Sequence, residues 1–282
     1  MKFSVFEVLK AASEQFSAAH IDNPRLDAEI LLAHVLKWRR LQLYVDSDKI
    51  LPIESVLRFN QLVNRRLEGF PVAYLTGSKD FMGLTFAVNE NVLIPRPDTE
   101  ILAEGVGNYL HGLGREVIFA DLGAGSGAIC VSILKFVQSA RACAVDVSAE
   151  ALEVAKFNAI KFHVEDRIKF FYGDLFEPLT GKFDAIVSNP PYIPTNDLKN
   201  LQSEVKREPR IALDGGIDGL NFYRRIFSDA PRFLVKGGLL AVEIGINQAQ
   251  AVKSLAEAAN FVDIQIFKDL AGIERVVTGF SA

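Results

Sequence analysis

The sequence predicts an α/β fold preceded by a smaller helical domain. Three features lead to this prediction: strand and helix patterns alternate after residue 115, a glycine-rich loop follows the first of these strands, and residues 1–75 carry helical patterns. Alternation of this kind is typical of a mostly parallel sheet with helices on both faces. A length of 282 residues accommodates about two domains.

The composition is that of an ordinary globular protein, with 49% hydrophobic and 23% charged residues. We expect neither a membrane span, because no apolar run reaches about 18 residues, nor a signal peptide. Cys130 and Cys143 lie in apolar stretches, so we expect buried thiols in a reducing cytoplasm. The four scattered histidines predict no metal site.

The charge balance bears on the class of substrate. Lys and Arg number 31 against 35 Asp and Glu, which gives a net charge of −4. A protein that grips a long phosphate backbone is expected to be basic. The balance therefore disfavours nucleic acid as the substrate without excluding it.

The first part of the chain, residues 1–75, is predicted to be helical. Asn23 and Pro24 are typical of a helix start, as N-cap and first helical residue. Apolar residues then recur at helical spacing over residues 26–35, and a second such pattern covers residues 55–67.

A linker over residues 76–98 follows, in which the period becomes strand-like. Residues 85–88 and 92–94 are predicted to pair as a β-hairpin around residues 89–91. Asp98 or Thr99 is expected to cap the next helix.

Residues 99–282 are predicted to form the α/β domain. A long loop that contains four prolines between positions 190 and 209 interrupts it. The expected helices cover residues 128–137, 149–162, about 220–234 and 247–259. The expected strands cover residues 117–120, 142–145, 168–172, 183–187 and 239–244, with two more at the end.

The glycine-rich loop, Gly123-Ala124-Gly125-Ser126-Gly127, joins the first strand of this domain to a helix. Glycine is needed where the backbone approaches a ligand closely, and the helix start offers free N–H groups. The loop therefore predicts a nucleotide-type ligand. With Ala128 it also satisfies the dinucleotide pattern G-x-G-x-x-A, so the loop alone leaves NAD open.

Two acids end the next strands. Asp146 follows Gly123 by 23 residues, and its carboxylate is expected to accept hydrogen bonds from both ribose hydroxyls. Asp174 ends the third strand and is a candidate acceptor for an adenine amino group. An acid in that place is more often a turn residue or a helix cap.

The tetrapeptide Asn189-Pro190-Pro191-Tyr192 follows the fourth strand and indicates the chemistry. Two prolines fix φ and remove two N–H donors, which leaves backbone carbonyls free to face a ligand. Asn189 adds a side-chain acceptor and Tyr192 an aromatic face. Together they predict a rigid cradle for a planar group that carries an NH₂.

This tetrapeptide resembles the [DNS]-P-P-[YF] motif of methyltransferases that use S-adenosylmethionine to methylate planar amino nitrogens. The lone pair of such a nitrogen is delocalised, and acceptance of both N–H hydrogens by Asn189 and the Pro190 carbonyl would localise it. Holding the nitrogen about 3–3.5 Å from the methyl carbon adds a proximity effect. The motif indicates a reaction but no single substrate, because methyltransferases of DNA adenine, ribosomal RNA guanine and protein glutamine share it.

Three further features narrow the resemblance. The first is the helical N-terminal domain, and the second is the pair of segments Pro71–Gly77 and Phe81–Leu84. The third is the run Ile94-Pro95-Arg96-Pro97-Asp98-Thr99-Glu100. With the two motifs, nearly the whole chain resembles the PrmC/HemK family of bacterial release factor glutamine methyltransferases. The resemblance implies N5-methylation of the glutamine in the Gly-Gly-Gln motif of class 1 peptide chain release factors.

The same resemblance implies a fold: a class I, Rossmann-like methyltransferase domain with a seven-stranded, mostly parallel sheet whose last strand is antiparallel. A small all-α N-terminal domain and a β-hairpin linker precede it. We expect the N-terminal domain, residues 1–75, to dock the protein substrate, because it is separate from the chemical motifs.

Carried over by position, the resemblance assigns the cofactor to the loop 123–127, Asp146, Asp174 and Leu175. Leu175 stands where several relatives have an aromatic residue, so it is expected to pack against the adenine without stacking. Arg96 and Glu100 are expected either to order the linker or to face the methionine end of the cofactor.

The tetrapeptide is assigned to catalysis and the substrate. Asn189 is expected to contact both cofactor and target amide, with Pro190 and Tyr192 as its catalytic partners. Pro191 completes the substrate slot.

Three alternatives remain open at this point. A methyltransferase of rRNA or DNA amino groups shares the motif but is disfavoured by the charge. An NAD-dependent oxidoreductase fits the glycine loop but leaves residues 189–192 unexplained. A catalytically silent binding module is the third.

Overall fold

The computed structural model of the chain describes residues 3–282 and divides into two compact units. The first unit comprises the chain up to Gly77 together with residues 202–207, and the second comprises residues 78–201 and 208–282. Among the described residues, no helix combines the length and the apolar character that crossing a membrane requires.

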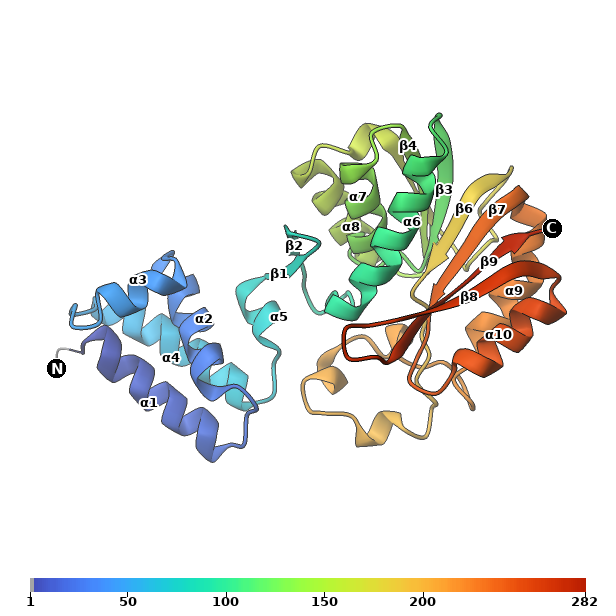
Figure 1. The fold of residues 1–282 in the computed structure, drawn as a ribbon. Coiled ribbons are helices and arrows are strands. Elements are labelled where there is room, and N and C mark those ends of the chain that lie inside the picture. The colour runs from blue at the N-terminus through green and yellow to red at the C-terminus, as the bar shows by residue number, and fades with distance from the viewer. Residues whose placement is uncertain (1–2) are drawn as a thin grey trace. The chain divides into compact units, whose positions relative to one another are not determined.

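The first unit is a group of packed helices (Figure 1). They surround one apolar core in which Phe16, Leu31 and Phe59 are fully buried. Its second helix begins at Pro24, as predicted, although the Asn23 side chain forms no capping hydrogen bond. The helices are α1 (Val5–Ala18), α2 (Pro24–Leu36), α3 (Arg40–Val45), α4 (Ile53–Leu67) and α5 (Val72–Thr76).

Residues 202–207 belong to this helical unit although they lie far along the chain. The buried Arg66 guanidinium donates from Nε to Asp27 Oδ2 at 2.8 Å and also pairs with Glu204. Arg207 donates to the Glu68 carbonyl at 2.8 Å. The long proline-containing loop is therefore tied at its middle to α4, which no local pattern in the sequence indicates.

The second unit is a single α/β domain with a seven-stranded sheet of order β5-β4-β3-β6-β7-β9-β8. The pairs among β3 to β7 are parallel, and β9, the last strand, is antiparallel to both of its neighbours. The predicted mostly parallel, seven-stranded fold is confirmed. Its strands are β3 (Val117–Leu122), β4 (Ala140–Asp146), β5 (Ile168–Tyr172), β6 (Phe183–Ser188), β7 (Leu234–Glu243), β8 (Phe261–Lys268) and β9 (Glu274–Ser281).

Helices cover both faces of this sheet (Figure 1). One apolar cluster lies under α6 (Glu100–Gly112), α7 (Ala128–Phe136) and α8 (Ala149–Lys161), and the other under α9 (Asn221–Phe233) and α10 (Ala249–Ala258). Cys130 belongs to the first cluster and Cys143 to the second, and both are free, buried thiols as predicted.

The β-hairpin lies earlier than predicted. It pairs β1 (Ser78–Phe81) with β2 (Leu84–Ala87) around Met82 and Gly83, whose φ angles of 50° and 70° suit a type I′ turn. Residues 92–94 form no strand. Their apolar character reflects burial in the unit, and the Ile94 N–H donates to Glu208 Oε2 at 3.0 Å.

Candidate active site

A cleft lies at the carboxyl ends of β3, β4 and β6. β3 and β6 are neighbours in the sheet although β4 and β5 lie between them in the chain, so the winding reverses here. Ligands of open α/β sheets bind at such a point. The predicted site residues that line the cleft are Gly123, Gly125, Asp146, Asp174, Leu175, Asn189, Pro190 and Pro191.

The glycine loop is held by backbone contacts to β4. The N–H groups of Gly123 and Ala124 both donate to the Val145 carbonyl, at 2.9 and 3.0 Å. Gly127, the N-cap residue of α7, has a φ angle of 77°, and a Cβ at this position would lie 3.2 Å from the Ala155 Cβ. Of the loop, Gly123 and Gly125 line the cleft, whereas Ala124, Ser126 and Gly127 do not.

Asp146 connects the loop to the next helix. Its Oδ2 accepts from the Gly125 N–H at 2.8 Å and its Oδ1 from the Ser148 N–H at 2.9 Å. Burial raises the pKa of this carboxyl, while the N–H donors oppose the shift. Each carboxylate oxygen can accept a second hydrogen bond, so Asp146 retains acceptor capacity toward a ligand hydroxyl.

The third strand contributes a less constrained pair of residues. Asp174 lies at the cleft wall and pairs with Arg225 Nη2 at 2.7 Å. Leu175 is buried, with φ 49°, and lines the cleft beside it. Phe222, at the start of α9, is an aromatic residue of the wall that sequence reasoning did not identify. It stands far along the chain from the acid, so no local pattern revealed it.

The opposite side of the cleft is formed by the segment after β6. The buried Ser188 hydroxyl donates to the Leu122 carbonyl at 2.7 Å, which joins this segment to the end of β3. Asn189, Pro190 and Pro191 then line the cleft. The cofactor-side loop and the tetrapeptide, 60-odd residues apart in the sequence, thus share one cavity.

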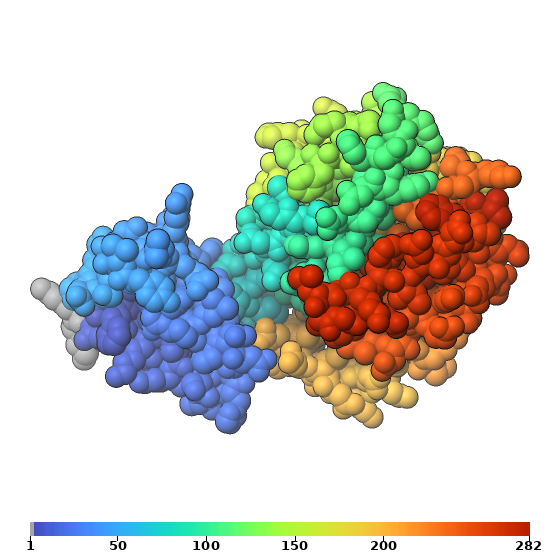
Figure 2. Space-filling view, in the orientation of Figure 1, coloured from blue at the N-terminus to red at the C-terminus, as the bar shows by residue number. Residues whose placement is uncertain are grey.

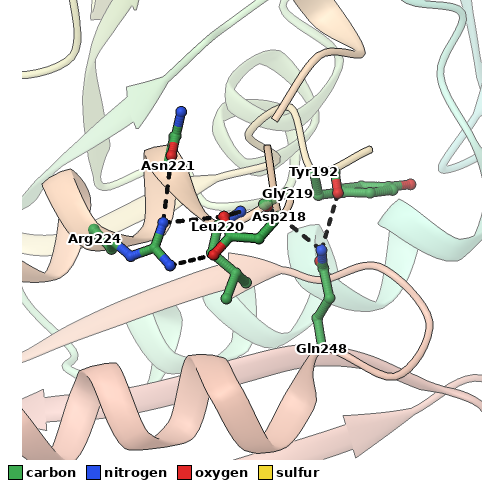
Figure 3. A network of polar contacts seen from close by, with 7 residues as sticks. All are labelled: Tyr192, Asp218, Gly219, Leu220, Asn221, Arg224 and Gln248. Carbon is green, nitrogen blue, oxygen red and sulfur yellow. Dashed lines mark hydrogen bonds and ion pairs between the residues drawn. The ribbon is translucent and has the colours of Figure 1, made fainter. Parts of the chain in front are cut away.

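Tyr192 is not in the wall of this cleft. It packs beside the apolar cluster under α9, and its carbonyl accepts from Gln248 Nε2 at 2.9 Å (Figure 3). The Gln248 amide also reaches the Gly219 carbonyl at 3.4 Å, so it ties the tetrapeptide to the turn before α9. Burial, reinforced by the nearby Glu243, raises the pKa of Tyr192 to about 12.

The proline-rich linker is anchored by ion pairs and hydrogen bonds. Arg96 pairs with Glu208, whose carboxylate also accepts from the Ile94 N–H. Glu100 Oε1 accepts from the Met82 N–H of the hairpin turn at 2.7 Å. Arg96 thus joins the linker to the long loop and Glu100 joins the hairpin to α6, and neither residue lines the cleft.

Comparisons with known proteins match this architecture. The family model "PrmC N-terminal domain" matches residues 7–77, and "Methyltransferase small domain" matches residues 99–216. A release factor glutamine methyltransferase of Moorella thermoacetica is 44% identical over 271 residues, covering 95% of each chain. One of Geobacter sulfurreducens is 44% identical over 261 residues, covering 92% of this chain and 90% of its own. The chain belongs to the release factor glutamine methyltransferase family.

A solved structure supports the fold of this family member. A methyltransferase from Pyrococcus furiosus has a TM-score of 0.53 at 17% identity, covering 78% of this chain and 97% of its own. Membership in the family confirms the predicted methyltransferase class, for which S-adenosylmethionine is the implied methyl donor. It also decides against the NAD-dependent oxidoreductase.

Two residues behind the tetrapeptide have roles at the site that the sequence did not predict. Thr99 occupies the N-cap position of α6, as predicted, but its hydroxyl forms no capping bond and accepts from Asn189 Nδ2 at 3.2 Å. Glu243 ends β7 and is 2% exposed. Burial raises the pKa of Glu243 to about 7, opposed by hydrogen bonds from Thr99 and Asn189. A single acid after an apolar strand carried no distinguishing signal.

Proposed function

We propose that this chain transfers a methyl group to the side-chain amide nitrogen, N5, of the glutamine in the Gly-Gly-Gln motif of class 1 peptide chain release factors. The observation that carries the proposal is the placement of Asn189 and its two prolines in the same cleft as the glycine loop and Asp146. The names of the relatives identify the substrate class. With two free, buried cysteines, we place the reaction in the cytoplasm.

The cofactor side of the cleft suits S-adenosylmethionine, which supplies a methyl group bound to a sulfonium leaving group. Gly123 and Gly125 present backbone without side chains to the cavity, where a Cβ would take up ligand space. Asp146 offers lone pairs to the ribose hydroxyls. Asp174 and Leu175 line the region assigned to the adenine, where Phe222 supplies an additional apolar face.

The tetrapeptide orients the target amide. Asn189 Oδ1 and the Pro190 carbonyl accept the two N–H hydrogens, which turns the nitrogen lone pair toward the methyl carbon. Pro190 and Pro191 have no N–H, so no backbone donor competes for these acceptors. The amide nitrogen loses one proton to solvent after transfer, so no strong base is required.

The helical unit is proposed to dock the release factor. Apolar side chains are exposed on it, with Leu41 and Val45 on α3 each 73% exposed and Ile53 at the start of α4 57% exposed. Figure 2 shows this part of the chain, in light blue, at the surface of the helical unit. Leu41 and Val45 lie four residues apart on α3 and therefore share one face of it, and exposed apolar surface of this kind is typical of a protein-binding site. We name Leu41 and Val45 the α3 patch.

The docking role is tested by Leu41→Asp with Val45→Asp. We expect a raised KM for the intact release factor and unchanged transfer to a short peptide that contains Gly-Gly-Gln. Leu270→Asp, at a fully exposed leucine of the other unit, is the matched control. Equal KM values for the patch variant and the control would contradict docking through the α3 patch.

The activity itself is tested with radiolabelled S-adenosylmethionine and a class 1 release factor, either intact or with its Gly-Gly-Gln glutamine changed to alanine. We expect label on the intact factor alone, and mass spectrometry of the tryptic peptide should assign it to glutamine. Parallel arms contain rRNA and DNA. Label in either of these and none on the factor would overturn the proposed substrate while retaining a methyltransferase.

A further inference from the structure

Three side chains from separate elements meet behind the cleft. Thr99 lies at the start of α6, Asn189 follows β6, and Glu243 ends β7. Thr99 is 5% exposed and Glu243 2% exposed, so neither reaches solvent, whereas Asn189 lines the cleft. We name these three residues the Asn189 triad.

The hydrogen bonds of the Asn189 triad determine which way the amide faces. Asn189 Nδ2 donates to Thr99 Oγ1 at 3.2 Å, and the amide also forms a hydrogen bond with the Glu243 carboxyl. The Thr99 hydroxyl interacts with Glu243 in turn. An ionised carboxylate only accepts hydrogen bonds. The groups that face it must therefore be donors, namely the NH₂ of the Asn189 amide and the hydroxyl hydrogen of Thr99. Oδ1 is the remaining polar atom of the Asn189 side chain.

We propose that Thr99 and Glu243 are positioning residues that hold the Asn189 amide with its NH₂ turned inward and Oδ1 toward the cleft, ready to accept from the target amide. The assignment rests on the proposed function for the identity of that amide. With the opposite rotamer, Asn189 would present a donor to a donor, and the target nitrogen would lose one of its two acceptors.

The charge state of Glu243 controls this arrangement. Its Oε2 has no hydrogen-bond partner among the described residues, so the other carboxyl oxygen is the one that Thr99 and Asn189 face. Protonation removes the negative charge that holds the NH₂ of Asn189 inward, and a proton on the facing oxygen would make it a donor that favours an inward Oδ1. The triad therefore requires the ionised form.

Several groups face this carboxyl. Arg275 favours the ionised form, whereas Asp98 opposes it and is itself paired with Arg275 Nη2 at 2.8 Å. The Tyr192 and Tyr223 rings lie close enough for the charge of Glu243 to raise the pKa of both hydroxyls. The Tyr223 hydroxyl donates to the Glu243 carbonyl at 2.8 Å, not to its carboxylate.

Three substitutions test the positioning roles in the transfer reaction. Glu243→Gln keeps the shape but supplies a donor, and Thr99→Val keeps the shape but removes the hydroxyl. We expect each to lower kcat roughly 10- to 100-fold, because a misplaced Asn189 amide no longer holds the target nitrogen in the reactive position. The KM for S-adenosylmethionine should change little. Thr99→Ser retains the hydroxyl and should retain most of the rate. A loss in Thr99→Ser equal to that in Thr99→Val would contradict a hydrogen-bonding role.

The pH profile separates positioning from a merely structural role. The wild-type kcat should fall as the pH drops below about 7, where Glu243 takes up a proton. Glu243→Gln should have a low rate without this acidic limb. Asp121 has the same raised pKa, about 7, so Asp121→Asn is the control and should retain the limb. An unchanged limb in Glu243→Gln would overturn the proposal.

A second readout is independent of activity. In ¹⁵N-labelled protein without substrate or cofactor, the Asn189 side-chain NH₂ signal, assigned from its loss in Asn189→Ala, should shift with pH in the wild type and not in Glu243→Gln. A signal insensitive to both changes would refute the triad even if transfer were observed. Titration of the signal without any transfer to release factor would instead refute the proposed function.

Discussion

On the cofactor side of the cleft, the contiguous glycine loop is held through its own backbone N–H groups: that of Gly125 donates to the Asp146 carboxylate, and that of Gly123 donates to the Val145 carbonyl. On the substrate side, Asn189 depends on buried side chains from two distant elements, Thr99 and Glu243. A site held by backbone hydrogen bonds tolerates single side-chain substitutions better than a site held by a side-chain relay, in which one buried side chain positions another. The two sides should therefore respond differently to substitution.

Asn189→Ala should produce the largest effect, because it removes one acceptor and the group that the relay positions. We expect kcat to fall by about 10³-fold, equivalent to about 4 kcal/mol, with the cofactor Kd changed much less. Single-turnover methyl transfer measures the rate. Asn108→Ala, an exposed asparagine on α6, is the matched control. An Asn189→Ala rate within tenfold of wild type would remove Asn189 from the chemistry.

Asp121, the buried acid below the glycine loop, should affect stability and not transfer. Burial raises its folded-state pKa from 3.8 to about 7, and one oxygen, Oδ1, has no partner among the described residues. The folded state thus binds more protons between these pH values, and stability falls as the pH rises through this window.

In Asp121→Asn this loss disappears. The free energy of unfolding of the variant relative to wild type should increase by about 2–4 kcal/mol between pH 4 and pH 7 and then level off. Denaturant unfolding at each pH measures it. A difference that does not vary with pH would contradict the raised pKa.

Asp146→Asn sharpens the comparison on the cofactor side. The variant presents an NH₂ to the Gly125 or Ser148 N–H, where the carboxylate accepted from both. We expect S-adenosylmethionine to bind roughly 10- to 100-fold more weakly, in line with loss of a charged hydrogen bond. Calorimetric titration measures the Kd. Asp174→Asn is the matched control and should have a smaller effect, because Asp174 is more exposed.

Arg225→Ala should have the smallest effect. The Arg225 and Asp174 side chains are 45% and 37% exposed, so solvent screens their pairing. We expect the cofactor Kd to change by less than about fivefold, equivalent to less than about 1 kcal/mol. Arg224→Ala, which breaks the similar Asp218 pair outside the cleft, is the control. A tenfold effect of Arg225→Ala alone would show that the cofactor side also depends on a side-chain relay.

The same contrast explains what the sequence could predict. The glycine loop and the tetrapeptide are short contiguous motifs whose chemistry follows from residue type and spacing, and the alternating pattern predicted the sheet around them. The supports of Asn189 come from elements that meet only in the folded chain. Thr99 was predicted as a helix cap and Glu243 was not identified, because neither forms a pattern with its neighbours.

Two structural features were missed for related reasons. The hairpin was placed at residues 85–94 because the buried residues 92–94 have strand-like composition, while the actual turn uses Met82, an uncommon residue at positive φ. Attachment of residues 202–207 to the helical unit depends on the buried Arg66, whose partners Asp27 and Glu204 are remote from it in sequence. Long-range ion pairs of this kind leave no periodic signal.

The division of roles across the cleft is tested most directly by single-turnover transfer to a release factor over a range of S-adenosylmethionine concentrations, in the wild type, Asn189→Ala and Asp146→Asn. We predict that Asn189→Ala lowers the maximal rate at nearly unchanged half-saturation. Asp146→Asn should raise the S-adenosylmethionine concentration needed for half-saturation and should approach the wild-type rate at high cofactor concentration. A lower maximal rate in both variants, or a higher half-saturating concentration of S-adenosylmethionine in both, would contradict this account.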